Sequence, residues 1–277
     1  MVMMISLFLL VGCGDTSPET LVDELRVMAS VAEPPEVRPD TAFTYNTYLA
    51  NPDEDDVVSI TWVCTNLGDG CLEAQGGSKS IGYAELNGSA PVWEQELSVS
   101  PVLMGMLDDE AMTATQVWTL ACTRGTCPII DEVKPVANTT DPWPESIRET
   151  LANPLPWMSD LPMQGVSLAY QLLSTSLSDT PHQNPRLAPD ENVPESLTRN
   201  KSFSLTFNID GLLSEDAQLY NYISGGGFKF PNTFVTAGAT VTLEGVAPKS
   251  DDETRVWVVL TDGLGGVAVW TEEFSIE

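Results

Sequence analysis

Apolar and polar residues alternate along most of the chain, and a period of two is typical of β-strands that bury one face. In the first part of the chain this alternation is interrupted at Pro34-Pro35 and at the acidic turn Asn51–Asp56. The strands predicted there are 27–31, 43–49, 58–64, 81–86, 96–100, 118–122 and 166–172. The pattern therefore predicts a chain built mainly from short strands.

The alternation returns after residue 200, where strands are predicted at 203–209, 219–223, 241–243, 256–260 and from 267 onward. Between the last two lies Asp262-Gly263-Leu264-Gly265-Gly266, and glycines supply the positive φ angles that a tight connection requires. We therefore predict a β-hairpin there.

A proline-rich segment lies within the first group of strands, before its last strand, 166–172. It covers about 128–165, and its best helical stretch, 144–151, follows Asp141 and begins with proline, as a helix start should. We expect this segment to be an insertion that caps one end of a sandwich. The polar run 178–190, which is punctuated by prolines, is the natural linker.

Two groups of short strands with turns between them predict an all-β fold of two antiparallel immunoglobulin-like β-sandwiches. The first would cover 23–177 with its partly helical insertion, and the second, immunoglobulin-like or PKD-like, would cover 191–277. A length of 277 residues suits two domains that each bury a core.

The amino-terminal residues have the features of a lipoprotein export signal. Met1–Val11 is too short to span a bilayer but has the length of a signal-peptide core, although Met1–Met4 carries no Lys or Arg. The run ends in Leu10-Val11-Gly12-Cys13, which matches the bacterial lipobox, where small residues precede the lipidated cysteine. Residues 1–12 would be removed as a signal peptide, and 13–22 would form a flexible tether.

Lipid on Cys13 would anchor the protein, since each buried methylene contributes about 0.8 kcal/mol. No other apolar stretch approaches the ~20 residues of a membrane helix, and no cofactor besides this covalent lipid is expected. Gly14, rather than Asp, follows the cysteine, which favours the outer membrane of the cell envelope over the inner membrane.

The chain is strongly acidic, with 40 Asp and Glu residues against 12 Lys and Arg, a formal net charge of -28. Binding to nucleic acid requires clustered Lys and Arg, whereas the basic residues here are scattered between Arg26 and Arg255. We therefore expect no nucleic-acid partner, and anionic lipid headgroups would repel the body of the protein.

Four cysteines remain after Cys13, and an even number in an oxidising compartment predicts two disulfides. We favour Cys64–Cys71 and Cys122–Cys127, because each pair brackets a short loop that contains glycine. The alternative joins Cys64 to Cys122 across two sheets, in the immunoglobulin manner. We expect no metal site, because the spacings do not match a zinc motif and His182 is the only histidine.

Leu25-Arg26-Val27-Met28-Ala29, followed by Ala32-Glu33-Pro34-Pro35-Glu36-Val37-Arg38-Pro39, resembles the opening of largely uncharacterised surface lipoproteins of myxobacteria and related lineages. The Asn184-Pro185 step and the end 256–267 also resemble that group and the final hairpin of immunoglobulin-like and PKD-like modules. The resemblance implies a sandwich fold and an envelope location, and it implies no chemistry.

No catalytic constellation is evident, so no catalytic residues are predicted. His182 lies in Thr180-Pro181-His182-Gln183-Asn184-Pro185, which is typical of an exposed linker. The acidic runs 53–56, 108–110 and 251–253 lack the glycine-spaced ligand pattern of a known calcium loop, and solvated turn charge is the simpler interpretation. The aromatic cluster Tyr220, Tyr222, Phe228 and Phe230 is a candidate carbohydrate or peptide platform, although aromatics in sandwich strands usually belong to a core.

The sequence therefore predicts a lipoprotein that is not an enzyme and that binds an envelope protein or polysaccharide or serves as a structural component. We expect the segment 131–162 to carry any specific contact, because irregular additions vary on a rigid scaffold. Two alternatives stay open, an envelope polysaccharide hydrolase that uses paired carboxylates and an adhesin stiffened by calcium.

Overall fold

The computed structural model describes residues 18–65, 80–100, 102–103, 113–137, 143–152, 161 and 164–277. The strands are β1 (Arg26–Glu33), β2 (Glu36–Val37), β3 (Ala42–Ala50), β4 (Val57–Cys64), β5 (Ile81–Leu86), β6 (Val92–Ser98), β7 (Thr113–Thr123), β8 (Val166–Thr175), β9 (Arg186–Pro189), β10 (Ser196–Leu197), β11 (Ser202–Asp210), β12 (Gln218–Ile223), β13 (Gly227–Phe228), β14 (Asn232–Phe234), β15 (Thr240–Val246), β16 (Glu253–Thr261) and β17 (Val267–Ile276). The helices are η1 (Pro18–Thr20), α1 (Pro128–Val133) and α2 (Glu145–Ala152). In the described part of the chain, no helix has the length and apolar character needed to cross a membrane.

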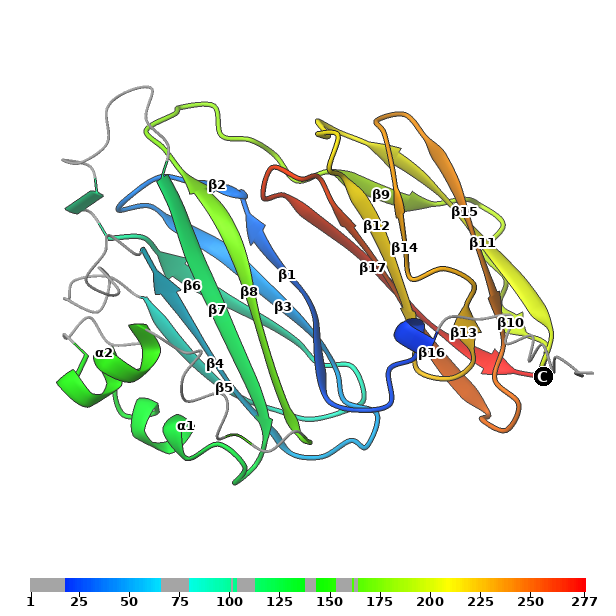
Figure 1. Cartoon of the computed structure of the whole chain (residues 1–277), viewed down its shortest axis with the longest axis horizontal. Coiled ribbons are helices and arrows are strands. Elements are labelled where there is room, and N and C mark those ends of the chain that lie inside the picture. Colours follow the sequence, from blue (N-terminus) through cyan, green and yellow to red (C-terminus); the bar gives the residue numbers. More distant parts are fainter. Residues whose placement is uncertain are drawn as a thin grey trace, which may run out of the picture.

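The amino-terminal domain is a sandwich of a three-stranded sheet, β1-β3-β6, and a five-stranded sheet, β2-β8-β7-β4-β5 (Figure 1). The chain leaves the first sheet after β1 at Pro34-Pro35, which offers no main-chain donor to a ladder, and joins the second sheet as β2, parallel to β8. In the usual lettering the order is A-B-E facing G-F-C-C′, which is that of an immunoglobulin-like domain.

Strand β4 of the five-stranded sheet is buried on both faces, because the insertion covers its face that points away from the sandwich. Every residue of β4 is buried. On that outer face Ile60 and Trp62 pack with Ile130 of α1 and Leu151 of α2. The Trp62 indole N–H donates to the Leu151 carbonyl oxygen at 3.1 Å. The expectation that the insertion caps one end of the sandwich is therefore wrong, since both helices lie against a sheet face.

Buried threonines occupy part of the opposite face, which points into the sandwich. The Thr61 and Thr119 hydroxyls lie 3.2 Å apart, and the Thr115 hydroxyl lies 2.8 Å from those of both Thr65 and Thr175. Each hydroxyl can donate and accept, so these side chains satisfy one another without water. This pairing allows strands with alternating polar residues to be buried on both faces.

The carboxyl-terminal domain repeats the plan with sheets β13-β15-β11-β9 and β10-β17-β16-β12-β14. Again the first strand, β9, joins one sheet, and a short second strand, β10, runs parallel to the last strand of the other sheet. Phe207, Leu219 and Phe228 are completely buried in the core between them. The prediction of an all-β fold with two antiparallel immunoglobulin-like sandwiches is thus confirmed.

The predicted hairpin at the end of this domain is also confirmed. Strands β16 and β17 pair antiparallel from Glu253↔Ser275 to Thr261↔Val267. Gly263 and Gly265 in the connection have φ angles of 74° and 107°, which residues with a Cβ rarely adopt.

Residues 18–22, which we call the strap, pack on the carboxyl-terminal domain before the chain enters β1. Thr20 and Val22 are 0% and 2% exposed. The Phe228 amide donates to the Thr20 hydroxyl at 3.0 Å, and the Val22 amide donates to the Ile223 carbonyl at 2.9 Å. The expected flexible tether over 13–22 is therefore wrong for the strap, and residues 13–17 lie outside the described part.

The predicted linker 178–190 contains a strand. Residues Arg186–Pro189 form β9, which pairs with β11 from Asp210↔Arg186 to Phe207↔Pro189. The second domain therefore begins at Arg186, earlier than the expected position 191. The sequence pattern did not indicate this strand because its four residues include a charge and a proline, both of which are common on edge strands.

The predicted disulfide between Cys122 and Cys127 is present and connects the end of β7 to the residue before α1. The alternative Cys64–Cys122 bridge is wrong, because both residues lie in one sheet, where Cys64 pairs with Gln116 and Cys122 with Val58. Cys64 is also disulfide-bonded. Its predicted partner Cys71 lies outside the described residues, so the Cys64–Cys71 bridge stays a prediction.

A cluster of charges fastens α1 to the edge strand β5. Glu85 accepts hydrogen bonds from Lys134 at 2.8 Å, from the Tyr83 hydroxyl at 2.7 Å and from Arg124 at 2.9 Å. These donors, Lys134 foremost, lower the pKa of the Glu85 carboxyl to about 2. Arg124 precedes α1 and Lys134 follows it, so the carboxylate holds both ends of the helix.

We expect this cluster to weaken in acid. A glutamate in the unfolded chain has a pKa of about 4.3, so the stabilisation is complete above that pH and is lost as the pH falls towards 2. In a ¹³C NMR titration the Glu85 side-chain carboxyl should therefore still be ionised at about pH 3. Lys134→Met should move its midpoint upward. A midpoint near that of a free glutamate in the wild-type protein would contradict the cluster.

Candidate functional site

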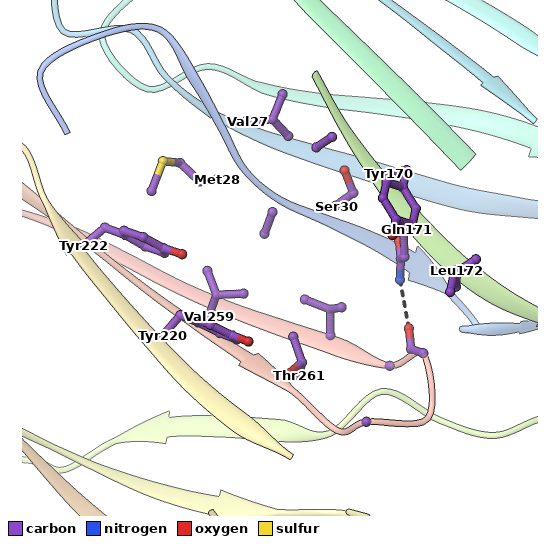
Figure 2. A pocket seen from close by; sticks show the side chains of 16 residues that line it. Val27, Met28, Ser30, Tyr170, Gln171, Leu172, Tyr220, Tyr222, Val259 and Thr261 are labelled. Atoms are coloured by element: carbon purple, nitrogen blue, oxygen red, sulfur yellow. Dashed lines mark hydrogen bonds between the residues drawn. The ribbon is translucent and has the colours of Figure 1, made fainter. Parts of the chain in front are cut away.

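A cleft with a volume of about 620 Å³ lies between the two domains (Figure 2). One wall comes from 27–30 of β1 and 169–172 of β8, and the other from β12, β16 and the hairpin connection that follows. Ligand sites frequently lie at domain interfaces and combine an apolar lining with a few polar groups. We therefore treat this cleft as the candidate functional site.

A bulge in β1 turns successive apolar residues towards the second domain. The register of β1 with β3 shifts between Val27 and Ala29, which leaves Met28 as the extra residue. Val27 packs against a cluster of the first domain, whereas Met28 shares a hydrophobic cluster with Trp257, and Ala29 packs against one that contains Val259, both of the second domain. An inserted residue changes the face on which the following residues lie. Met28 and Ala29 therefore both face the second domain.

Tyr220 and Tyr222 project from β12 on the other side of the cleft (Figure 2). They alternate with Leu219 and Ile223, which point into the core of the second domain. Burial raises the pKa of the Tyr222 phenol, while Arg26, whose guanidinium lies 5.5 Å from the ring centroid, acts in the opposite direction. The phenol therefore stays protonated at neutral pH and can donate a hydrogen bond to a ligand.

The hairpin tip lies at one end of the cleft and is held there by the linker and by β8. Buried Asp262 accepts two main-chain amides of the tip through Oδ1, at 2.7 and 2.8 Å, and its Oδ2 lies 2.6 Å from His182 Nε2. From the first domain, Gln171 Nε2 donates to the Gly265 carbonyl at 2.9 Å (Figure 2). The tip is thus fixed both to the linker and to β8.

The chain's single histidine lies where the linker meets the hairpin tip, a place that we call the junction. The expectation of an exposed linker residue is therefore wrong. The His182 side chain is 15% exposed and its partner Asp262 is 0% exposed. The His182 amide donates to Glu36 of the first domain at 2.7 Å. Nearby, Asn184 donates to the Ala32 carbonyl at 2.7 Å and accepts from the Val267 amide at 2.8 Å. The sequence pattern did not reveal this junction, because His182 and Asp262 are 80 positions apart.

The other residues singled out from the sequence do not gather in one place. Cys13 lies outside the described residues. The aromatic cluster divides, because Tyr220 and Tyr222 line the cleft, Phe228 is core and Phe230 is 73% exposed. No described residue of the insertion 128–165 lines the cleft.

Among the described residues that line the cleft, none is acidic or basic. Carboxylates gather instead at a second pocket of about 370 Å³, which is lined by Glu54, Asp251, Glu253 and Glu273. All four are exposed, whereas a carboxyl group that acts as a general acid needs an environment that raises its pKa. Within the described ranges, no group of three or more His, Cys, Asp or Glu residues is placed to hold a metal ion.

Comparisons with known proteins identify no family. No protein-family model and no curated protein matches the chain. The Salmonella α2-macroglobulin that was reacted with methylamine aligns with 91% of this chain and 16% of its own length, at 9% identity and a TM-score of 0.28. A chimeric titin Z1Z2 tandem aligns over 92% of this chain and 97% of its own, at 12% identity and a TM-score of 0.29. The D0–D1 domains of intimin align over 90% and 98%, at 8% identity and a TM-score of 0.26. Similarity at this level assigns no function.

Asp262 should be the residue whose loss most weakens the end of the cleft at the hairpin tip. Asp262→Ala leaves two amides and His182 without their acceptor, and each buried donor left unpaired costs about 1–3 kcal/mol. We expect the free energy of unfolding in urea to fall by about 2–5 kcal/mol. Glu215→Ala, at an exposed position nearby, is the matched control and should change it by less than about 0.5 kcal/mol. Equal stability of the two variants would contradict this role.

Proposed function

We propose that this protein is a lipoprotein of the bacterial cell envelope, attached through lipid on Cys13, that binds a partner without catalysing a reaction. The observation that carries the proposal is the lipobox Leu10-Val11-Gly12-Cys13 at the end of a short apolar run. The partner would be an envelope protein or polysaccharide. The resemblance to surface lipoproteins of myxobacteria and related lineages is part of the same proposal.

The strap supports a location of the body close to the membrane. Cys13 and Pro18 are five positions apart, and five extended residues reach about 17 Å. From Pro18 onward the chain packs on the second domain through Thr20 and Val22. A lipid on Cys13 would therefore hold the second domain and the domain junction near the bilayer. Gly14 after the cysteine favours the outer membrane.

The character of the cleft supports binding rather than catalysis. Its described lining combines apolar side chains with tyrosine, glutamine and threonine, and it contains no acid or base that could transfer a proton at neutral pH. The carboxylates that a polysaccharide hydrolase would need lie in solvent at the second pocket. The cleft is the part of the body that we propose to engage the partner.

Attachment through Cys13 can be tested by metabolic labelling with tritiated palmitate. The wild-type protein should carry label and sediment with membranes, because two or three acyl chains hold it permanently. Cys13→Ser should remove the label and leave an uncleaved leader. Cys127→Ser is the matched control and should keep the label. An unlabelled wild-type protein in the soluble fraction would contradict the proposal.

A further inference from the structure

Strand β8 presents an unpaired edge to the cleft. On one side β8 pairs with β7 along its whole length, from Thr113↔Thr175 to Cys122↔Val166. On the other side, within the described part of the chain, its main-chain partner is β2, which reaches only Ser174 and Thr175. The preceding residues 169–172 line the cleft.

The ladder determines which main-chain groups face the open side. The Thr123 amide donates to the Gly165 carbonyl at 2.7 Å, and in an antiparallel pair alternate residues turn both main-chain groups to the partner strand. Odd-numbered residues of β8 therefore bond to β7 and even-numbered residues point away. The bond from the Ser176 amide to the Val37 carbonyl, on the β2 side, agrees with this phase. Leu168, Tyr170 and Leu172 thus direct N–H and C=O groups away from β7.

The open edge has none of the usual protection against pairing. Val166–Thr175 contains no charged residue and no proline, and Tyr170 and Leu172 are 57% and 47% exposed. Three other edge strands do carry such residues. Strand β5 contains Glu85, β6 contains Glu94 and Glu96, and β9 contains Arg186 and Pro189. Natural proteins protect sheet edges in this way, so an unprotected edge indicates a pairing function.

We propose that the β8 edge docks an extended segment of a partner protein, which adds to the five-stranded sheet as a strand beside Leu168–Leu172. This inference rests on the proposed binding role and names the site and the ligand class. The main-chain groups of Leu168, Tyr170 and Leu172 would supply the hydrogen bonds, and the apolar cleft lining would receive alternate side chains. The Gly265 carbonyl, held by Gln171, marks the end of the slot at the hairpin tip.

The surroundings select the occupant. The cleft residues that the structure describes carry no charge, while the chain as a whole carries -28, so an acidic segment is repelled and a neutral or basic one is favoured. A second copy of this chain has the same net charge and would be repelled in the same way.

Gln171 supplies a further contact for such a segment. Gln171 is 8% exposed, its side-chain nitrogen donates to the Gly265 carbonyl, and its Oε1 has no hydrogen-bond partner among the described residues. A buried acceptor without a partner costs stability. A donor brought in along the edge would satisfy it, which makes the bound state the better-paired one.

The test selects phage-displayed random dodecapeptides on the full lipidated protein in detergent, with counter-selection on Leu172→Lys. We expect enriched peptides with alternating apolar residues and few acids. A synthetic peptide with the most enriched sequence should bind Leu172→Lys at least about tenfold more weakly than wild type, because a lysine on the edge opposes strand addition. Val92→Lys is the matched control, since Val92 is 51% exposed on the edge strand β6 outside the cleft, and it should bind as wild type does.

Two measurements test the main-chain contact itself. Two peptides should be compared, each methylated on alternate main-chain nitrogens. Binding should be lost when the methylated nitrogens are those that face β8 and kept when they face away, because only one set of N–H groups can bond to β8. Hydrogen exchange should be fast at Leu168, Tyr170 and Leu172 in the free protein and slow in the complex. Slow exchange at the odd-numbered residues of β8, which bond to β7, verifies that each variant is folded.

Three outcomes would overturn the proposal. The first is that no peptide is enriched over Leu172→Lys. The second is that chitohexaose, a neutral oligosaccharide, binds in the cleft while no peptide does. The third is self-association in ultracentrifugation that Leu172→Lys abolishes. Palmitate labelling of Cys13 is read separately, so failure of peptide binding and failure of lipid attachment are distinguishable.

Discussion

Strand β1 belongs to two hydrophobic contacts at once, and the relative position of the domains depends on this. Its ladder with β3 holds it from Arg26 to Glu33, while the bulge at Met28 presents apolar side chains to the second domain. A shift of one residue would exchange the faces of the strand and disrupt both contacts. The cleft lies between the two domains where β1 joins them, because residues 27–30 of β1 form part of one of its walls.

Much of the fold could be predicted from alternation alone, because a strand with one buried face leaves a period of two in the sequence. The burial of a strand on both faces could not be predicted in this way. In β4, Ser59 and Thr61 alternate with apolar residues as solvent-facing positions would, yet both are completely buried. The only signal was that the polar residues on this face are hydroxyl-bearing and not charged, and such residues can be satisfied by one another.

Of the candidate site, the sequence pointed to Tyr220 and Tyr222. The rest could not be predicted, because its parts come from distant segments. Residues 27–30, 169–172, 220 and 222 meet only when both domains are assembled. The strap and the His182 junction could not be predicted for the same reason, since short segments that contact distant partners resemble linkers in sequence. One signal was present in the sequence: ten residues of β8 carry no charge in a chain with 52 charged side chains, 40 acidic and 12 basic.

The strap also determines how mechanical force travels through the molecule. A pull on the chain before Pro18 would act first on the bridge between Leu21 and Ile223 and on the Thr20 contact, both of which belong to the second domain. Leu21 and Ile223 run parallel, so tension along the chain loads this contact before it reaches β1. The contact of the strap with the second domain therefore takes up such a pull before β1 and the amino-terminal domain do.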